Sequence, residues 1–181
     1  MKAGHVLRNL KASDGREVIL RSVEWSDVDD LLELVNSLVE EGADFPVEKK
    51  KTRVEETKWI AGQLVAIESD RKVAIVAEID GKTIGHVIVE PQPRRSSHVG
   101  SLVIMVRDGY RDIGVGTGLL EEAERQSKML GLKILELEVY ATNKRAQHVY
   151  KKKGYNQVGY LSNAIFKNEN YVDSIVMAKV L

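Results

Sequence analysis

The sequence predicts a fold of the α/β (α+β) class, because extended segments bounded by turn residues are interspersed with amphipathic helical segments. The clearest of these observations is Val103 to Leu120, where an apolar run leads through a glycine-rich bend into helical apolar spacing. The second is a pair of Asp-Gly turns, Asp14-Gly15 and Asp80-Gly81, each lying between two extended segments. We expect about seven strands and about four helices.

The amino-terminal third is expected to form a strand or hairpin (residues 5–25) and then two helices. Ser26 and Asp29 form a capping pattern, and the apolar stripe that follows them ends at Gly42. A loop and a second helix follow, and the ranges expected here are strands Val6–Lys11 and Glu17–Trp25, loop Glu41–Pro46 and helix Val47–Glu68.

The rest of the chain is expected to contain six strands and two helices. One helix begins after Gly114 and the other after Asn143. The expected strands are Lys72–Asp80, Thr83–Glu90, His98–Val106, Leu132–Tyr140, Tyr155–Ile165 and Tyr171–Leu181. In the strand Leu132–Tyr140, alternation places Glu136 and Glu138 on one face, where they need either an open cleft or cationic partners.

Composition limits the class of protein. The 181 residues fit one domain, and Lys plus Arg equal Asp plus Glu at 27 each, so no net charge favours nucleic acid or an anionic membrane. There is no cysteine for disulfides or thiolate sites, and the four histidines lack metal-ligand spacing. No apolar run reaches the length of a signal or membrane span. We expect a cytoplasmic protein with no metal, no nucleic acid and no membrane partner.

The bend before the third helix has the composition of an anion site. A helix N-terminus offers unpaired N–H groups, and Gly114 and Gly116 let an anion approach them closely. A dinucleotide fingerprint would need G-x-G-x-x-G, and a Walker loop would need a lysine at the start of the helix; neither is present. The alternative is that these glycines only turn a corner.

Two motifs together resemble those of one family. Arg111 to Gly116, RDIGVG, is similar to the Q/R-x-x-G-x-G/A signature of the GCN5-related N-acetyltransferases (GNAT), and Asn143 to Tyr155 is similar to their N-x-x-A-x-x-x-Y-x-x-x-G-[FY]. The tail resembles that of bacterial amino-acid and phosphinothricin-type members at Asn168, Tyr171, Asp173 and Met177, although Glu169 stands where those relatives prefer glycine. The resemblance implies one GNAT domain over 1–181, with its core at 17–181 and a mixed, mostly antiparallel sheet.

The resemblance also implies acetyl-CoA as co-substrate and a homodimer formed through the C-terminal strands. Tyr150 would protonate the departing thiolate, although an inward tyrosine is also an ordinary core residue. Arg111 is expected to face the surface, and Asn143 is equally well explained as an N-cap. The residues implied for the donor are Met105, Val106, Arg111, Asp112, Ile113, Gly114, Val115, Gly116, Thr117, Asn143, Arg145 and Tyr150, and Lys144 and Lys151 are further candidates for the 3′-phosphate.

The general base is less well defined. Glu138 is the choice as catalytic carboxylate beside Tyr150, and the alternatives are Glu90, His98 and Glu41. Glu41 or Asp44 could receive the substrate ammonium, and Arg94 with Arg95 could hold a substrate carboxylate.

The expected activity is acetyl transfer from acetyl-CoA to a primary amine of an amino acid or another small molecule. The alternative enzyme acetylates protein N-termini or lysines. An alternative of another class is a non-catalytic acyl-CoA-binding sensor, against which Tyr150 argues, because a binder needs no thiolate acid.

Overall fold

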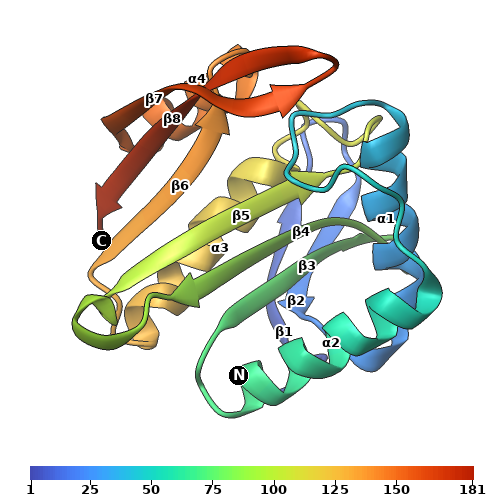
Figure 1. Cartoon of the computed structure of the whole chain (residues 1–181). Coiled ribbons are helices and arrows are strands. Elements are labelled where there is room, and N and C mark those ends of the chain that lie inside the picture. Colours follow the sequence, from blue (N-terminus) through green and yellow to red (C-terminus); the bar gives the residue numbers. More distant parts are fainter.

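A computed structural model describes all 181 residues, and its central feature is one eight-stranded sheet. The strand order is β1-β2-β3-β4-β5-β6-β8-β7, and every neighbouring pair is antiparallel except β5–β6 (Figure 1). The Asp-Gly turns were predicted correctly, and each joins an antiparallel pair. The strands are β1 (Val6–Lys11), β2 (Glu17–Ser22), β3 (Val73–Ile79), β4 (Lys82–Pro91), β5 (Val99–Val106), β6 (Ile134–Tyr140), β7 (Asn156–Lys167) and β8 (Asn170–Val180).

The one parallel pair is short, and this opens the sheet. Residues 99–101 of β5 pair with residues 134–136 of β6, and beyond them the two strands diverge (Figure 1). We call these three pairs the β5–β6 seam. Gly100 is required there by close approach, because a Cβ on it would lie 2.6 Å from Val89 and 2.9 Å from Leu135. Past the seam, residues 102–106 of β5 have a strand partner only in β4.

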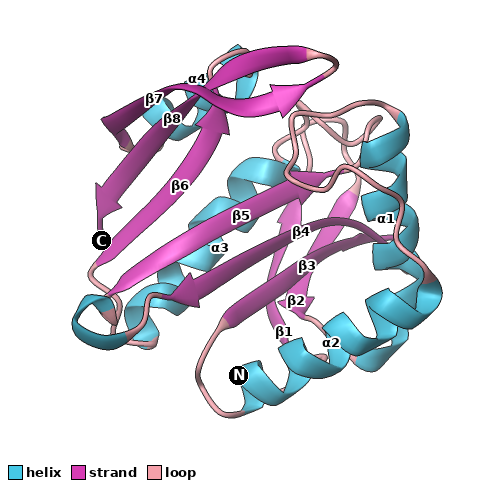
Figure 2. Ribbon diagram, in the orientation of Figure 1, coloured by secondary structure: helices cyan, strands magenta, loops and turns pink.

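Helices cover both faces of the sheet (Figure 2). The larger core joins one face to α3 (Val115–Met129) and α4 (Lys144–Lys152), and it contains Leu119 and Tyr150. The smaller core joins the other face to α1 (Val28–Glu40) and α2 (Arg53–Glu68), and it contains Leu34 and Met105. None of the helices is both long and apolar enough to cross a membrane.

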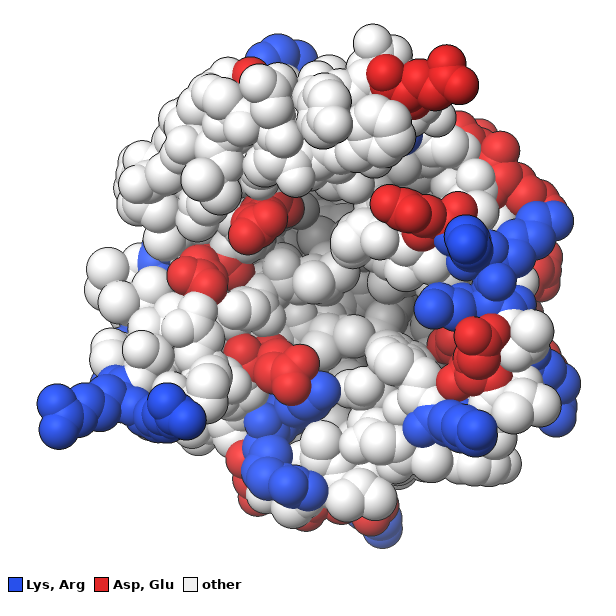
Figure 3. Space-filling view, in the orientation of Figure 1, with Lys and Arg blue, Asp and Glu red and all other residues white.

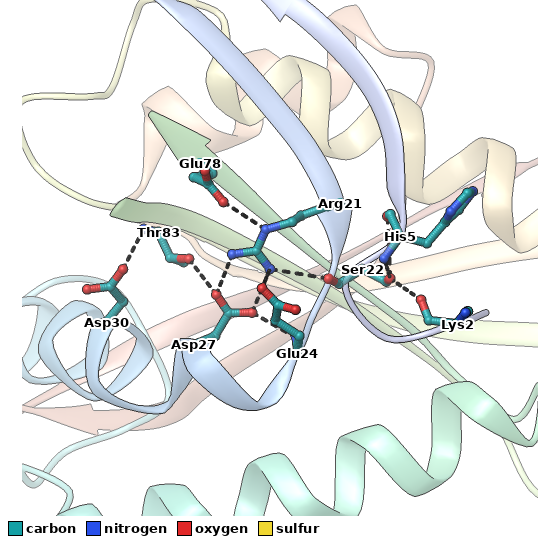
Figure 4. Close-up of polar contacts among 9 residues, drawn as sticks. All are labelled: Lys2, His5, Arg21, Ser22, Glu24, Asp27, Asp30, Glu78 and Thr83. Carbon is teal, nitrogen blue, oxygen red and sulfur yellow. Dashed lines mark hydrogen bonds and ion pairs between the residues drawn. The ribbon is translucent and has the colours of Figure 1, made fainter. Parts of the chain in front are cut away.

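A buried polar network fixes the start of α1 (Figure 4). Arg21 donates to both carboxylate oxygens of Asp27 (2.7 and 2.8 Å) and to Glu78 (2.8 Å). Asp27 also accepts from the Thr83 hydroxyl and from the Glu24 backbone N–H. Burial disfavours the charged guanidinium, but the hydrogen bonds to Asp27 and Glu78 raise the pKa of Arg21.

The expected caps of α1 and α2 were misplaced. The capping box is formed by Glu24 and Asp27, and not by Ser26 and Asp29; it caps a single 3₁₀ turn, Trp25–Asp27, that leads directly into α1. The second helix begins at Arg53, six residues later than expected, because Thr52 and Glu55 form its capping box. Residues 47–52 therefore lengthen the connection between α1 and α2.

The last hairpin forms one edge of the sheet. Strands β7 and β8 pair through a turn in which Asn168 and Glu169 have φ of 50° and 61°, so Glu169 occupies a left-handed position that favours glycine. Strand β7 has no neighbour on its outer side. Several large apolar side chains of the hairpin are exposed: Val158, Tyr160, Leu161, Phe166 and Tyr171.

Candidate active site

The bend between β5 and α3 presents free backbone N–H groups. Asp112 and Gly114 have φ of 62° and 94°, and Gly114 is the N-cap residue of α3. The Gly118 N–H donates to the Gly114 carbonyl (2.9 Å), which is the first helical bond. The N–H groups of Val115, Gly116 and Thr117 therefore have no acceptor within the helix, and the positive end of the helix dipole lies beside them.

Three contacts outside the helix hold this bend in place. The Ser13 N–H donates to the Ile113 carbonyl (3.0 Å), which ties the bend to the β1–β2 turn. Arg111 donates from Nε to the Val106 carbonyl (2.9 Å) and pairs with Glu41 at the end of α1. The expectation that Arg111 faces the surface was wrong, because these two acceptors draw its side chain across the end of β5.

A basic cleft of about 340 Å³ lies over the bend. Arg145 pairs with Asp112 there at 2.9 Å, so this cation of the cleft already has a carboxylate partner. Free N–H groups together with a cluster of cations suit a diphosphate. The residues that line this cleft are Val106, Arg111, Asp112, Gly114, Gly116, Thr117, Arg145, His148, Val149, Lys152 and Lys153.

A larger cleft, of about 590 Å³, adjoins the basic one and has a mostly apolar lining. It takes residues from both faces of the sheet, such as Phe45 after α1 and Leu120 of α3, so it lies where β5 and β6 part. Seven residues predicted for the donor line it: Met105, Val106, Arg111, Gly116, Asn143, Arg145 and Tyr150. Its other lining residues are Leu38, Glu41, Ala43, Asp44, Phe45, Ile104, Leu120, Thr142, Lys144, Ala146 and Val149.

Tyr150 is the buried titratable group of this larger cleft. Its side chain is 9% exposed, and its ring lies 5.9 Å from the ring of Tyr155. Burial raises the pKa of Tyr150 to about 12, so its phenol is neutral near pH 7 and can donate a hydrogen bond. Tyr150 thus belongs both to the core and to the cleft wall.

Asn143 caps α4. Its side-chain oxygen accepts from the Ala146 N–H at 3.0 Å, which confirms the N-cap reading. The same residue lines the larger cleft, and its amide N–H₂ group is still available to a ligand.

Some predicted residues lie outside both clefts. Glu138 is exposed on the α1–α2 side of β6, where the Ser174 hydroxyl approaches it at 3.4 Å. Ile113 lines neither cleft, and Val115 is fully buried in the core, so each can offer only its backbone. Lys151 is exposed outside both clefts, whereas Lys144 lines the larger one.

The alternative bases and carboxylate ligands are far away or already paired. His98, Arg94 and Arg95 are exposed at the other end of β5 from the bend, about 25 Å along the strand. Glu90 pairs with Lys72 (3.1 Å). Glu41 pairs with Arg111, as described above.

Figure 3 shows the α1–α2 side of the molecule as a hollow with acidic side chains on both sides of it, whereas Lys and Arg lie mostly toward the outer edge. Alternation places Glu136 on this side of the sheet, and it accepts hydrogen bonds from Ser101 (3.1 Å) and Gln92 at the β5–β6 seam. This face of the sheet therefore carries acidic side chains beside the β5–β6 seam, whereas Glu41 and Asp44 in the cleft wall are paired with Arg111 and Lys167. No group of three or more His, Cys, Asp or Glu residues is arranged to hold a metal ion.

Sequence reasoning missed several cleft residues. Phe45, Thr142 and His148 line the clefts, although none of them belongs to a motif that identifies a ligand. Lys152 and Lys153 did carry a signal, because they follow Lys151 in a basic run at the end of α4.

Comparison with known proteins agrees with this geometry. The family model described as "Acetyltransferase (GNAT) family" matches residues 33–155, more than half of the chain. The L-amino acid N-acetyltransferase AaaT of Escherichia coli (strain K12) is 36% identical over 108 residues, which are 59% of this chain and 67% of AaaT. The N-alpha-acetyltransferase of Sulfurisphaera tokodaii is 24% identical over 183 residues, covering 94% of this chain and 98% of that protein.

A solved structure has the same fold. The phosphinothricin acetyltransferase of Sinorhizobium meliloti in complex with AcCoA superposes with a TM-score of 0.80 at 19% identity, covering 91% of this chain and 88% of that one. The family match and the cleft that opens between β5 and β6 lead to one conclusion: the chain belongs to the GNAT family of acetyl-CoA-dependent N-acetyltransferases.

Proposed function

We propose that the protein transfers the acetyl group of acetyl-CoA directly to the primary amine of an amino acid or another small molecule. The observation that carries this proposal is the neutral, buried Tyr150 in a cleft that continues into a basic, N–H-rich bend. The amino-acid acetyltransferase AaaT supports the substrate class.

The residues of the two clefts fit the donor. Backbone N–H groups of 115–117, with Arg145, Lys152 and Lys153, would hold the diphosphate and the neighbouring phosphate, and the edge of β5 at Met105 and Val106 would hold the apolar arm. Acetyl-CoA supplies a thioester, whose carbonyl carbon accepts the amine. The proton that the amine nitrogen loses balances the one that the sulfur gains.

In this scheme Tyr150 acts as a hydrogen-bond donor. A phenol whose pKa is about 12 is a weaker acid than a thiol, whose usual pKa is about 8.5. Tyr150 would therefore stabilise the developing thiolate through its O–H, and water would complete the proton transfer. On the amine side, Glu138 would act as the base through water: it lines neither cleft, but it lies on the same face of β6 as Tyr140, whose hydroxyl contacts the Phe45 carbonyl at the cleft wall.

We also propose that the whole chain forms one acetyltransferase domain, which works in the cytoplasm as a homodimer. Support for the dimer comes from β7, an edge strand with exposed apolar side chains. Light scattering after size exclusion would test it, with Tyr160→Lys as the variant expected to shift the mass toward a monomer. A wild-type monomer at micromolar concentration would refute it.

A second candidate function is acetylation of protein N-termini. The N-alpha-acetyltransferase of Sulfurisphaera tokodaii favours it, because the alignment covers nearly all of both chains.

One assay separates these functions: thiol release from acetyl-CoA over a panel of amino acids, polyamines, aminoglycosides and short peptides. The chain has no cysteine to react with the thiol reagent, so the signal comes from coenzyme A. Turnover restricted to free amino acids or small amines supports the proposal, and turnover restricted to peptides supports the second candidate. Binding of acetyl-CoA without turnover on any amine would favour a non-catalytic sensor.

A further inference from the structure

A short loop after α1 forms one wall of the larger cleft. We call residues 41–45 the acceptor-side loop; Glu41, Ala43, Asp44 and Phe45 all line the cleft. Gly42 has φ of 62°, the left-handed conformation in which a glycine commonly ends a helix. The position of this loop sets how much room the cleft has on the side opposite α3 and α4.

Lys167, at the end of β7, binds the acceptor-side loop, although the two lie far apart in the sequence. Its Nζ donates to the Gly42 carbonyl (2.7 Å), the Ala43 carbonyl (3.0 Å) and Asp44 Oδ1 (2.6 Å). An ammonium has three donors, and all three are used on one loop. Figure 1 shows the β7–β8 hairpin reaching across to this loop.

The end of β6 completes the attachment. The Thr142 hydroxyl donates to Asp44 Oδ2 (3.2 Å), and the Tyr140 hydroxyl donates to the Phe45 carbonyl (3.3 Å). The Lys167 ammonium also lies 5.6 Å from the centre of the Tyr140 ring. Both oxygens of Asp44 are therefore occupied, so this carboxylate is part of the attachment and is not free to receive an ammonium substrate.

The bend between β5 and α3, where the donor would bind, is held by contacts that do not involve Lys167. The Ser13–Ile113 bond and the start of α3 hold it without Lys167. Arg111 is the one side chain that links the bend to the acceptor-side loop, through Glu41. Loosening the loop at Lys167 should therefore change the acceptor side of the cleft and leave the donor side in place.

We propose that Lys167 is a positioning residue for the acceptor: it fixes the acceptor-side loop, neutralises Asp44 and so shapes the amine side of the cleft. This inference rests on the proposed acetyl transfer. The lysine and the loop are more than 120 residues apart in sequence, so their contact is a property of the folded chain.

The test compares Lys167→Met, which keeps the aliphatic stem, with Lys167→Arg, which restores charge and donors. The control is Lys11→Met, an exposed lysine on β1. Three quantities are measured: amide hydrogen exchange of residues 42–45, the Kd of acetyl-CoA by calorimetry, and the KM and kcat for the best amine of the panel.

For Lys167→Met we expect loop exchange and acceptor KM each to rise about tenfold or more, since three charge-assisted hydrogen bonds are lost. The Kd of acetyl-CoA should stay within about threefold, and Lys167→Arg should recover part of the KM. Unchanged loop exchange, or faster exchange with an unchanged KM, would overturn the proposal. If no amine is a substrate, the proposed function fails, whereas the exchange measurement still tests the attachment.

Discussion

His86 should make the stability of the protein depend on pH in mildly acidic solution. It lies on β4, is 1% exposed, and neither of its ring nitrogens has a hydrogen-bond partner. Its ring meets that of Trp59 edge-on at 5.4 Å. Burial lowers the pKa of His86 from 6.5 to about 4, an effect that the charge of Asp27 opposes only in part.

The direction follows from proton binding. Below pH 6.5 the unfolded chain binds a proton at His86 and the folded chain does not, so acid favours the unfolded state until the folded group also titrates near pH 4. The contribution of neutral His86 to the free energy of unfolding is therefore fully present above pH 6.5 and is lost as the pH falls toward 4. The full difference is about 3 kcal/mol at 1.36 kcal/mol per pKa unit, and about 2 kcal/mol of it should be lost between pH 7.5 and pH 5.

The assay is urea denaturation of the wild type and of His86→Leu at several pH values from 7.5 to 5. Carboxylates such as Glu33, whose pKa is lowered mainly by a hydrogen bond from Lys82, contribute equally to both proteins and cancel in the difference. The free energy of unfolding of the wild type should fall by about 2 kcal/mol more than that of the variant. Parallel pH profiles, or a His86 ring that NMR shows to be protonated at pH 6 in the folded protein, would refute the reasoning.

Three further predictions concern the site and its support. Tyr150→Phe should lower kcat about 10- to 100-fold, the value of a hydrogen bond to a charged group, and leave the Kd of acetyl-CoA within about threefold; a parallel loss of affinity would mean that the tyrosine is structural. Gly116→Leu should abolish acetyl-CoA binding in calorimetry and leave the far-UV spectrum unchanged, because a Cβ there meets only Val106 at 3.6 Å and the added bulk enters the cleft. The control is Gly62→Ala, which adds a methyl group to open space on α2. Undiminished affinity of Gly116→Leu for acetyl-CoA would exclude the bend as the donor site. Asp27→Asn should cost about 3–5 kcal/mol in urea denaturation, because it leaves the Arg21 guanidinium buried without its bidentate partner; a loss below about 1 kcal/mol would show that water replaces the carboxylate.

The parts of the fold that local chemistry determines were predictable. The Asp-Gly hairpins and the glycine-rich start of α3 depend on residues adjacent in sequence, and the structure has them at the expected positions. The start of α2 could also have been predicted from the sequence, because Thr52 and Glu55 form the same kind of capping pattern that was expected at Ser26.

The features that the sequence did not predict depend on contacts between residues far apart in the chain. The turn before α1 depends on Asp27, because Arg21 and Thr83 hold its carboxylate, and Thr83 is 56 residues away. Arg111 turns inward because Glu41 lies opposite it in space, and Lys167 reaches a loop that no pattern connects with it. Motif spacing predicted the glycine-rich bend at which α3 begins, whereas the loop after α1 is held by pairings between distant segments.

The short β5–β6 seam divides the sheet into two parts, which are joined there by only three residue pairs. Beyond it, the backbone of residues 102–106 has polar groups on one edge with no strand to pair with. A ligand arm bound there would pair with this edge of β5 as a neighbouring strand would. The protein with its ligand would then be more rigid than the free protein. Ligand at about 100 times its Kd would add about 2.7 kcal/mol to the free energy of unfolding. Melting temperature would then rise with the concentration of the bound ligand.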